Sequence, residues 1–294
     1  MSSKWLGIFS LCTLFLFTFT LPALAQETEK FQIGSFIIWT VADSTGERDM
    51  SVFTADAELL KRYVPAGKAP SGVMTFVLRT ADQNILIDTG HGRPQSRLMP
   101  GLAAIGLKPE DINLILITHM HGDHIGGLLS EGARAFPKAK VLIGRKEHDF
   151  WLNKNSPAEF PGREANFDLA QKVVDIYGDD VQTFQFEEEI VLGVKALEAG
   201  GHTPGHTAFL MESGGRRLLC IGDLLHAAAL QFPRPDLNAS YDMAPDQARA
   251  SRERILKMAA DEGLPIAGMH VAFPALGRVI KTGENSYEFQ PGLK

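Results

Sequence analysis

Cysteine is scarce in this sequence: its 294 residues include only Cys12 and Cys220. So few thiols exclude a disulfide-rich scaffold and a closed cysteine-rich zinc site. The chain also has no block of basic residues, because 29 Lys and Arg stand against 35 Asp and Glu, for a formal net charge of -6. Little is available to neutralise a phosphate backbone, so nucleic acid is not an expected partner.

Linkers and repeats are missing as well. No long stretch rich in proline, serine or glycine interrupts the chain after residue 25, and no repeat period is visible. Hydrophobic residues make up 45% and charged residues 22%, which is close to average globular usage and excludes a disordered chain. We therefore expect residues 26–294 to form a single folded domain.

The first 25 residues have the order of an export signal. Lys4 is followed by an uncharged run over residues 5–21, then by Pro22 and the small-residue triplet Ala-Leu-Ala at 23–25. A membrane anchor is the alternative, since an uncharged run of 17 residues reaches the short end of a bilayer span. The cleavage pattern favours a signal peptide, a mature chain from Gln26, a periplasmic or secreted location, and no membrane association after cleavage. Cleavage would leave Cys220 alone, without an intramolecular disulfide.

Apolar, β-branched runs alternate with helical patterns along the rest of the chain. Strands are expected at 36–41, 73–78, 85–87, 114–117, 141–143, 208–211, 218–221 and 265–267. Helices are expected at 97–105, 163–176 and 245–260, the last with Asp242 near its N-cap, Pro245 in its first turn and Gly263 after its end. Buried strands that alternate with helices predict a layered α/β fold.

The segment THMHGDHIGG at 118–127 carries the main chemical signal. It follows the apolar run 114–117, and the side-chain period of two in extended chain places His119 and His121 on one face. Asp123 and His124 come after the chain turns, so they would serve a second ion. A polar loop with exposed histidines is the alternative, but this density of ligands favours metal. Imidazole and carboxylate without thiolate suit Zn²⁺, with Mn, Co or Fe also compatible.

The motif His119-x-His121-x-Asp123-His124 resembles the signature of the metallo-β-lactamase fold superfamily. Three later segments resemble the superfamily's other ligand positions: GHTPGHT at 201–207, Gly-Asp at 222–223, and His270. The turn Asp-Thr-Gly at 88–90, which closes the expected strand 85–87, resembles the superfamily's entry motif. The resemblance implies a four-layer αββα sandwich and a two-metal hydrolase. It implies one ion held by His119, His121 and His202, the other by Asp123, His124 and His270, and Asp223 bridging both.

Several further residues have roles that the resemblance suggests. His206 would support the ligands without binding metal, and Thr118 and Thr203 would orient them. His226 would act with Asp123 in catalysis, as a proton donor to the leaving group, or else be a hydrogen-bonded core histidine. The segments around 149–152, 222–232 and 268–274 resemble the methyl parathion hydrolase-like and lactonase branch. Its substrate pocket would then include Phe150, Trp151 and Phe232, whose alternative is ordinary core packing.

These observations predict an exported metal-dependent hydrolase. Two cations would generate hydroxide near neutral pH and polarise a carbonyl or phosphoryl oxygen. The expected substrates are small lactones or carboxylic esters, with promiscuous cleavage of organophosphate triesters. A dedicated methyl parathion-type hydrolase, a β-lactamase and a non-catalytic metal-binding module are the alternatives, and a homodimer stays open.

Overall fold

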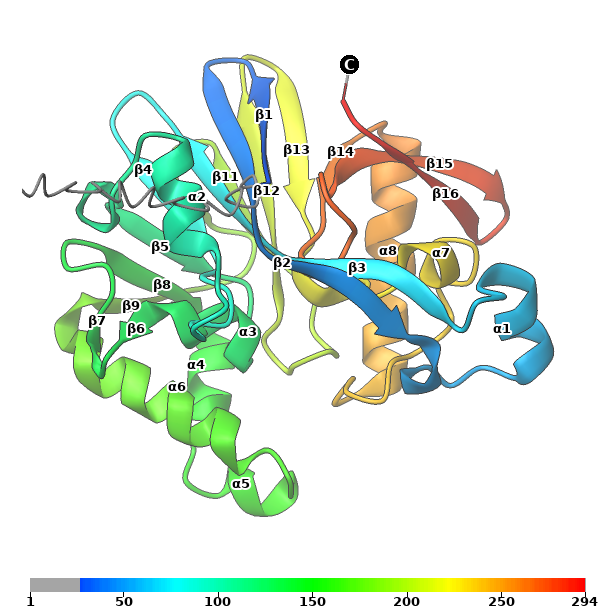
Figure 1. Cartoon of the computed structure of the whole chain (residues 1–294), viewed down its shortest axis with the longest axis horizontal. Helices are drawn as coiled ribbons and strands as arrows, with labels where there is room; N and C mark the ends of the chain where they lie inside the picture. Colours follow the sequence, from blue (N-terminus) through cyan, green and yellow to red (C-terminus); the bar gives the residue numbers. More distant parts are fainter. Residues whose placement is uncertain (1–26, 294) are drawn as a thin grey trace, which may run out of the picture.

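The computed structural model describes residues 27–293, so the expected export signal and Cys12 lie outside the described residues. Two seven-stranded sheets make the framework (Figure 1). The first has the order β1 (Thr28–Ile33), β2 (Phe36–Asp49), β3 (Lys68–Arg79), β4 (Asn84–Ile87), β5 (Leu114–Ile117), β8 (Lys140–Gly144) and β9 (Val181–Phe184). The second has the order β10 (Glu189–Val191), β11 (Val194–Glu198), β12 (Thr207–Ser213), β13 (Arg216–Cys220), β14 (Pro265–Ala267), β15 (Leu276–Gly283) and β16 (Ser286–Pro291).

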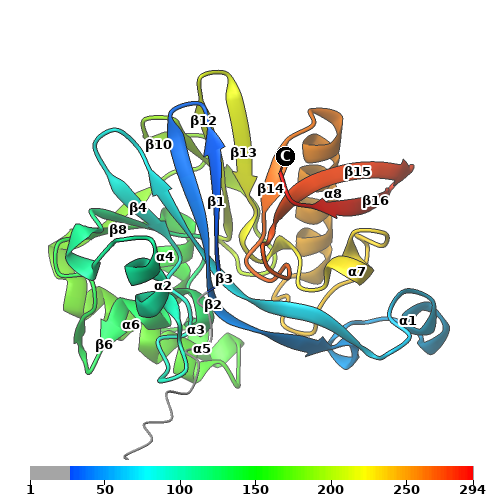
Figure 2. The same ribbon diagram turned by 45° about the horizontal axis from the view of Figure 1, so that its top comes forward.

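Helices cover the outer faces of both sheets. On the first sheet lie α2 (Leu98–Ala104), α3 (Gly122–Ile125), α4 (Arg145–Trp151) and α6 (Glu164–Tyr177), with the small pair β6 (Leu129–Ser130) and β7 (Ala133–Arg134), and α5 (Ser156–Glu159) lies beyond α4 and α6. The second sheet carries α7 (Ala228–Gln231) and α8 (Pro245–Asp261), and α1 (Ala57–Tyr63) lies beyond the long β2–β3 arm (Figure 2). Within residues 27–293 no helix is long and apolar enough to cross a bilayer.

The alternation of side chains in the strands explains the layers. In β5, Leu114 and Leu116 point into the core between the two sheets, whereas Ile115 and Ile117 pack under the helices of the first sheet. Cys220 of β13 faces the same central core, and Leu219 faces α8. Both faces of these strands are apolar because both are buried. The predicted four-layer αββα sandwich is confirmed.

The expected elements all form, most of them with shifted ends. β5 and β14 have the expected bounds, and the three expected helices correspond to α2, α6 and α8. β2 is longer than expected because its polar second half, after a bulge at 42–44, pairs with β3 in the projecting arm. Pro245 begins α8 as expected, but Asp242 does not cap it: the N-cap is Ala244, without a side-chain cap. The Asp242 carboxylate instead contacts His202, Arg252 and the Ala239 N–H.

Candidate metal centre

The expected ligand side chains converge where strands of the two sheets end. His119 and His121 follow β5, and Asp123 and His124 lie in the short helix α3. From the second sheet, His202 comes from the loop before β12, Asp223 follows β13 and His270 follows β14. Parallel strands β4 and β5, and parallel strands β13 and β14, end on the same side, which brings segments far apart in sequence together.

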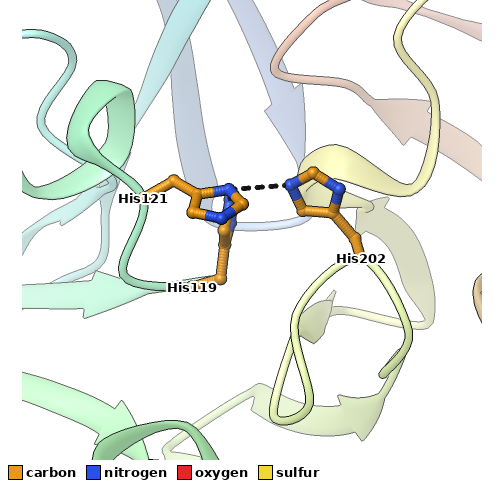
Figure 3. Close-up of side chains that lie close together, drawn as sticks. All are labelled: His119, His121 and His202. Carbon is orange, nitrogen blue, oxygen red and sulfur yellow. Dashed lines mark hydrogen bonds between the residues drawn. The ribbon is translucent and has the colours of Figure 1, made fainter. Parts of the chain in front are cut away.

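His119, His121 and His202 form the first group (Figure 3). His121 Nδ1 lies 3.0 Å from His119 Nε2 and 3.0 Å from His202 Nε2. The other ring nitrogens of two of these residues have partners: His119 Nδ1 lies 3.1 Å from Thr118 Oγ1, and His202 Nδ1 lies 3.0 Å from Asp242 Oδ1. These contacts place the ring protons of His119 and His202 on Nδ1, so the Nε2 atom of each ring presents a lone pair to His121.

The second group contains Asp123, His124, Asp223 and His270. His124 Nδ1 lies 2.6 Å from Asp88 Oδ2, and His270 Nδ1 donates to the carbonyl oxygen of Gly72 at 2.7 Å. Their Nε2 atoms therefore point inward, His124 Nε2 at 3.1 Å from Asp223 Oδ1 and His270 Nε2 at 3.0 Å from Asp223 Oδ2. His124 Nε2 and Asp223 Oδ1 are buried and make no hydrogen bond.

Asp223 joins the two groups. Its Oδ2 lies 3.4 Å from His202 Nε2 in the first group and 3.0 Å from His270 Nε2 in the second. Burial would raise the pKa of the Asp223 carboxyl, but His124, His270 and His119 outweigh it and hold the pKa well below its usual range. The carboxylate is thus ionised and available to two neighbours at once.

The imidazoles of the first group are held neutral. Burial, together with His124, lowers the pKa of His119 well below its ordinary value. Burial and His202 do the same for His121, and burial lowers the pKa of His202 to about 3. A neutral imidazole with a free lone pair is the form that binds a metal ion.

The geometry fits a pair of divalent cations. A single proton on His121 Nδ1 can be shared with only one of its two neighbouring nitrogens at a time, whereas a cation can satisfy all three. Tetrahedral zinc with bonds of about 2.0–2.1 Å has ligand atoms about 3.3 Å apart, close to the 3.0 Å separations of the first group. The donors are nitrogen and oxygen only, which suits Zn²⁺, Mn²⁺, Co²⁺ or Fe²⁺. The two groupings are those that the resemblance implies; metal binding itself stays a prediction.

A layer of hydrogen bonds fixes the ligands from outside. Asp88 accepts bonds from the Thr118 backbone N–H at 2.8 Å and the Thr118 hydroxyl at 2.6 Å, besides its contact with His124. His206 binds no ligand group directly: its Nδ1 donates to the Ala199 carbonyl and its Nε2 accepts the Asp223 N–H at 2.9 Å. At Gly222, with φ 53°, a Cβ would lie 2.4 Å from His206 Nε2, so glycine is needed there.

Glu147 of α4 ties three segments of the site together, and sequence analysis did not single it out. Its buried carboxylate accepts bonds from the Met120 N–H, the Trp151 indole N–H, the Thr203 hydroxyl and the Gly205 N–H, at 2.6–2.9 Å. The Thr203 hydroxyl therefore donates to Glu147 and not to the side chain of an expected metal ligand. A lone glutamate in a helix gave no local signal of this role.

A cavity of about 510 Å³ opens onto the metal groups. Its lining includes Asp123, His202, His226, Tyr241 and three arginines. The expected pocket aromatics lie elsewhere. Trp151 is 2% exposed and packs with Phe150 and Phe167 under the first sheet, although its ring is 5.6 Å from that of His121. Phe232 is 1% exposed and stacks on Phe289 in the core of the second sheet.

His226 does reach the cavity. Its Nε2 lies 3.1 Å from Asp223 Oδ2, and its buried Nδ1 has no hydrogen-bond partner. Burial lowers the pKa of His226 to about 3, against the opposing effect of Asp223. Ligand atoms of His202, Asp223 and His226 also lie within 4.8 Å of one another. His226 therefore lies where its ring can contact a substrate that is bound in the cavity next to Asp223.

Comparisons with known proteins identify the family of this chain. The chain belongs to the metallo-β-lactamase superfamily, whose family model matches residues 69–270. An N-acyl homoserine lactonase from Bacillus cereus is 27% identical over 164 residues, covering 48% of this chain and 58% of that protein. A lactamase-like protein, nscB, from Aspergillus fumigatus is 29% identical over 240 residues, covering 79% of this chain and 56% of that protein. The matched segments of the curated relatives span from 31% to 58% of their lengths.

Two solved structures extend the similarity to nearly the whole chain. The hydrolase AbOPH of the beta-lactamase superfamily has a TM-score of 0.84 at 27% identity, covering 92% of this chain and 99% of that chain. AidC, a dizinc quorum-quenching lactonase in complex with the product N-hexanoyl-L-homoserine, has a TM-score of 0.82 at 25% identity, covering 92% and 98%. The expected superfamily is confirmed.

Proposed function

We propose that this chain is a binuclear metal-dependent hydrolase of lactones or carboxylic esters, with cleavage of organophosphate triesters as a side activity. The observation that carries the proposal is the convergence of two ligand groups on one shared carboxylate, Asp223, beside an open cavity. A structural metal site is closed, whereas a catalytic one keeps positions open to a substrate.

Each residue of the site has a defined task in this proposal. His119, His121 and His202 would hold one ion, Asp123, His124 and His270 the other, and Asp223 both. When bound, the two cations would supply a nucleophile from water near neutral pH and polarise the carbonyl oxygen of the substrate. Asp88, Thr118 and Asp242 keep the imidazole lone pairs pointing inward.

His226 would serve the leaving group. Its ring lines the cavity and its Nε2 lies 3.1 Å from Asp223 Oδ2, so a proton at Nε2 is held next to the metal groups. An alkoxide leaving group needs a proton as the bond breaks, whereas a nitrophenolate does not. This difference makes the role of His226 testable by choice of substrate.

The named relatives support the choice of substrate class. AidC is a lactonase whose structure holds an acyl homoserine product, and the Bacillus cereus relative is an N-acyl homoserine lactonase. We propose lactones and esters for this chain on that similarity. We also propose that the chain is exported and processed before Gln26, on the sequence of residues 1–25.

The test measures hydrolysis by the purified chain on three substrates in parallel, with metal content determined on the same sample. The substrates are a long-chain homoserine lactone, a nitrophenyl ester and methyl parathion. Dominant lactone or ester turnover with about two metals per chain is expected from a binuclear site. Dominant methyl parathion turnover would reassign the chain to organophosphate hydrolysis, and no turnover with both metals bound would overturn the proposal.

A further inference from the structure

The cavity is cationic in an acidic protein. The whole chain has a formal charge of -6, yet the cavity beside the metal groups is lined by Arg48, Arg93 and Arg163. Among residues 27–293, the only acids that line it are Asp123 and Asp223, and both belong to the metal groups. Divalent ions bound there would make the cavity more positive still.

None of these three arginines makes an ion pair within residues 27–293. Asp242 acts on Arg163 at longer range, but burial outweighs it and lowers the pKa of that guanidinium. In the part of the chain that the structure describes, ion pairs join Arg97 to Glu27, Arg134 to Asp180 and Arg252 to Asp242. No carboxylate lies within 4.0 Å of Arg48, Arg93 or Arg163 in residues 27–293. Arg48 and Arg163 are partly buried, whereas Arg93 is exposed. Partly buried guanidinium groups without an ion pair, facing a cavity, are typical of a site for an anionic ligand.

Arg48, near the end of β2, reaches the cavity from the projecting arm. Its Nη1 donates to the Tyr241 hydroxyl at 2.7 Å, and its Nη2 lies 3.2 Å from His270 Nδ1. His270 Nδ1 already donates to the Gly72 carbonyl at 2.7 Å, so it cannot also accept from Arg48. The N–H groups of Arg48 Nη2 therefore remain available to a ligand.

Arg163, just before α6, approaches from the first sheet's helical layer. Its Nη2 donates to the Tyr241 carbonyl oxygen at 3.1 Å, and its Nη1 lies 3.4 Å from His121 Nε2. If His121 uses Nδ1 toward the metal group, its proton is on Nε2, and that nitrogen cannot accept from Arg163. Tyr241 thus positions both guanidinium groups, one through its hydroxyl and the other through its backbone.

We propose that the substrate of this site carries a carboxylate away from the bond that is cleaved, and that Arg48 and Arg163 bind it. This inference rests on the proposed function, because it names the kind of ester or lactone. A guanidinium fork meets a carboxylate in two parallel hydrogen bonds. The cavity of about 510 Å³ has room for such a group together with an acyl chain or ring.

The first test compares two esters that differ by one charge: 4-nitrophenyl hydrogen adipate and 4-nitrophenyl methyl adipate. We expect kcat/KM of the wild type to favour the acid by about tenfold or more, a factor that corresponds to about 1.4 kcal/mol. Arg48→Met and Arg163→Met should each reduce this ratio, and Arg48→Lys, which keeps the charge but not the fork, should give an intermediate value. Arg216→Met is the matched control, since Arg216 is exposed and lies outside this cavity.

The second test measures binding without turnover. Calorimetry on the chelated protein compares hexanoate with hexanamide, with circular dichroism to verify that each variant is folded. Hexanoate should bind about tenfold more tightly to the wild type, and the difference should disappear in Arg48→Met and Arg163→Met. Efficient ester hydrolysis with no arginine-dependent preference in either test would overturn this inference alone. A preference for hexanoate in a protein that hydrolyses no ester would overturn the proposed function but leave the anion site standing.

Discussion

Replacing Asp242 with asparagine should destabilise the protein and weaken metal binding together, because this one carboxylate faces two different groups. Its Oδ1 lies 3.0 Å from His202 Nδ1, and its Oδ2 accepts from Arg252 Nη2 at 3.2 Å and from the Ala239 N–H at 3.1 Å. An asparagine has one oxygen. If that oxygen faces His202, its NH₂ group confronts the N–H donors of Arg252 and Ala239.

The magnitude follows from the burial of Arg252, whose side chain is 1% exposed. Leaving one member of a buried ion pair uncompensated costs about 3–5 kcal/mol. We expect the lower value, about 3 kcal/mol, because Arg252 also donates to the carbonyl oxygens of Leu224, Pro235 and Leu237. At about 2–4 °C per kcal/mol, Tm should fall by about 6–12 °C. Loss of the outer hydrogen bond of a metal-binding histidine should lower metal affinity by about 10–100-fold.

The assay combines thermal unfolding of the chelated proteins with metal titration of each variant. Asp246→Asn is the matched control, since Asp246 is 93% exposed on α8, and its Tm should change little. The double variant Asp242→Asn with Arg252→Met should lose less stability than the sum of the single losses, because it removes both charges. A wild-type Tm for Asp242→Asn, or strictly additive losses, would refute this reasoning.

Four further outcomes are expected. Asp123→Ala should abolish turnover in a soluble chain, and chelation should inactivate the wild type reversibly; full activity in a metal-loaded Asp123→Ala sample would contradict the two-metal site. His226→Leu should slow lactone hydrolysis by about a hundredfold, the scale of general acid catalysis, and slow an aryl phosphotriester much less at equal metal content; equal losses would exclude proton donation. Burial raises the pKa of the Cys220 thiol, so in a chain that begins at Gln26 Ellman's reagent should react only after unfolding, and prompt reaction of the folded chain would show otherwise. N-terminal sequencing of the exported protein should begin at Gln26, and an uncut chain would argue for a membrane anchor.

Strand positions were predictable where a strand is buried on both faces. The run 114–117 is continuously apolar and is bounded by Asn113 and Thr118, so β5 has the expected ends. β2 continues to Asp49 through mostly exposed residues, including Ser44 to Glu47, whose composition is that of a loop. Only the pairing with β3 makes this segment a strand, and a single sequence does not show that pairing.

The candidate site divides in the same way. The expected ligands could be found because histidine and aspartate directly after apolar runs are unusual, and the structure brings all seven together. Arg48 and Arg163 carry no such signal, because arginines are common on surfaces and only the fold brings both to Tyr241. The prediction for Asp242 was wrong because a carboxylate close to the start of a helix normally caps that helix. Here the carboxylate contacts a histidine 40 residues away in the sequence. The aromatic residues around Trp151 show the opposite error, since core packing and pocket lining use the same residue types.

The expected metal ligands come from both sheets, so bound ions would link the two halves of the sandwich. His119, His121, Asp123 and His124 belong to segments that follow strands of the first sheet, whereas His202, Asp223 and His270 belong to the second. Ions held by these residues would therefore tie the two halves of the sandwich together, and each coordination group would be broken if the halves moved apart. By linkage, the free energy of ion binding would be added to the free energy that opposes their separation. Residues 27–293 contain one cysteine, the buried Cys220, and so no disulfide within them. The metal site would give this part of the chain a reversible cross-link, whose strength is set by the concentration of free metal around it.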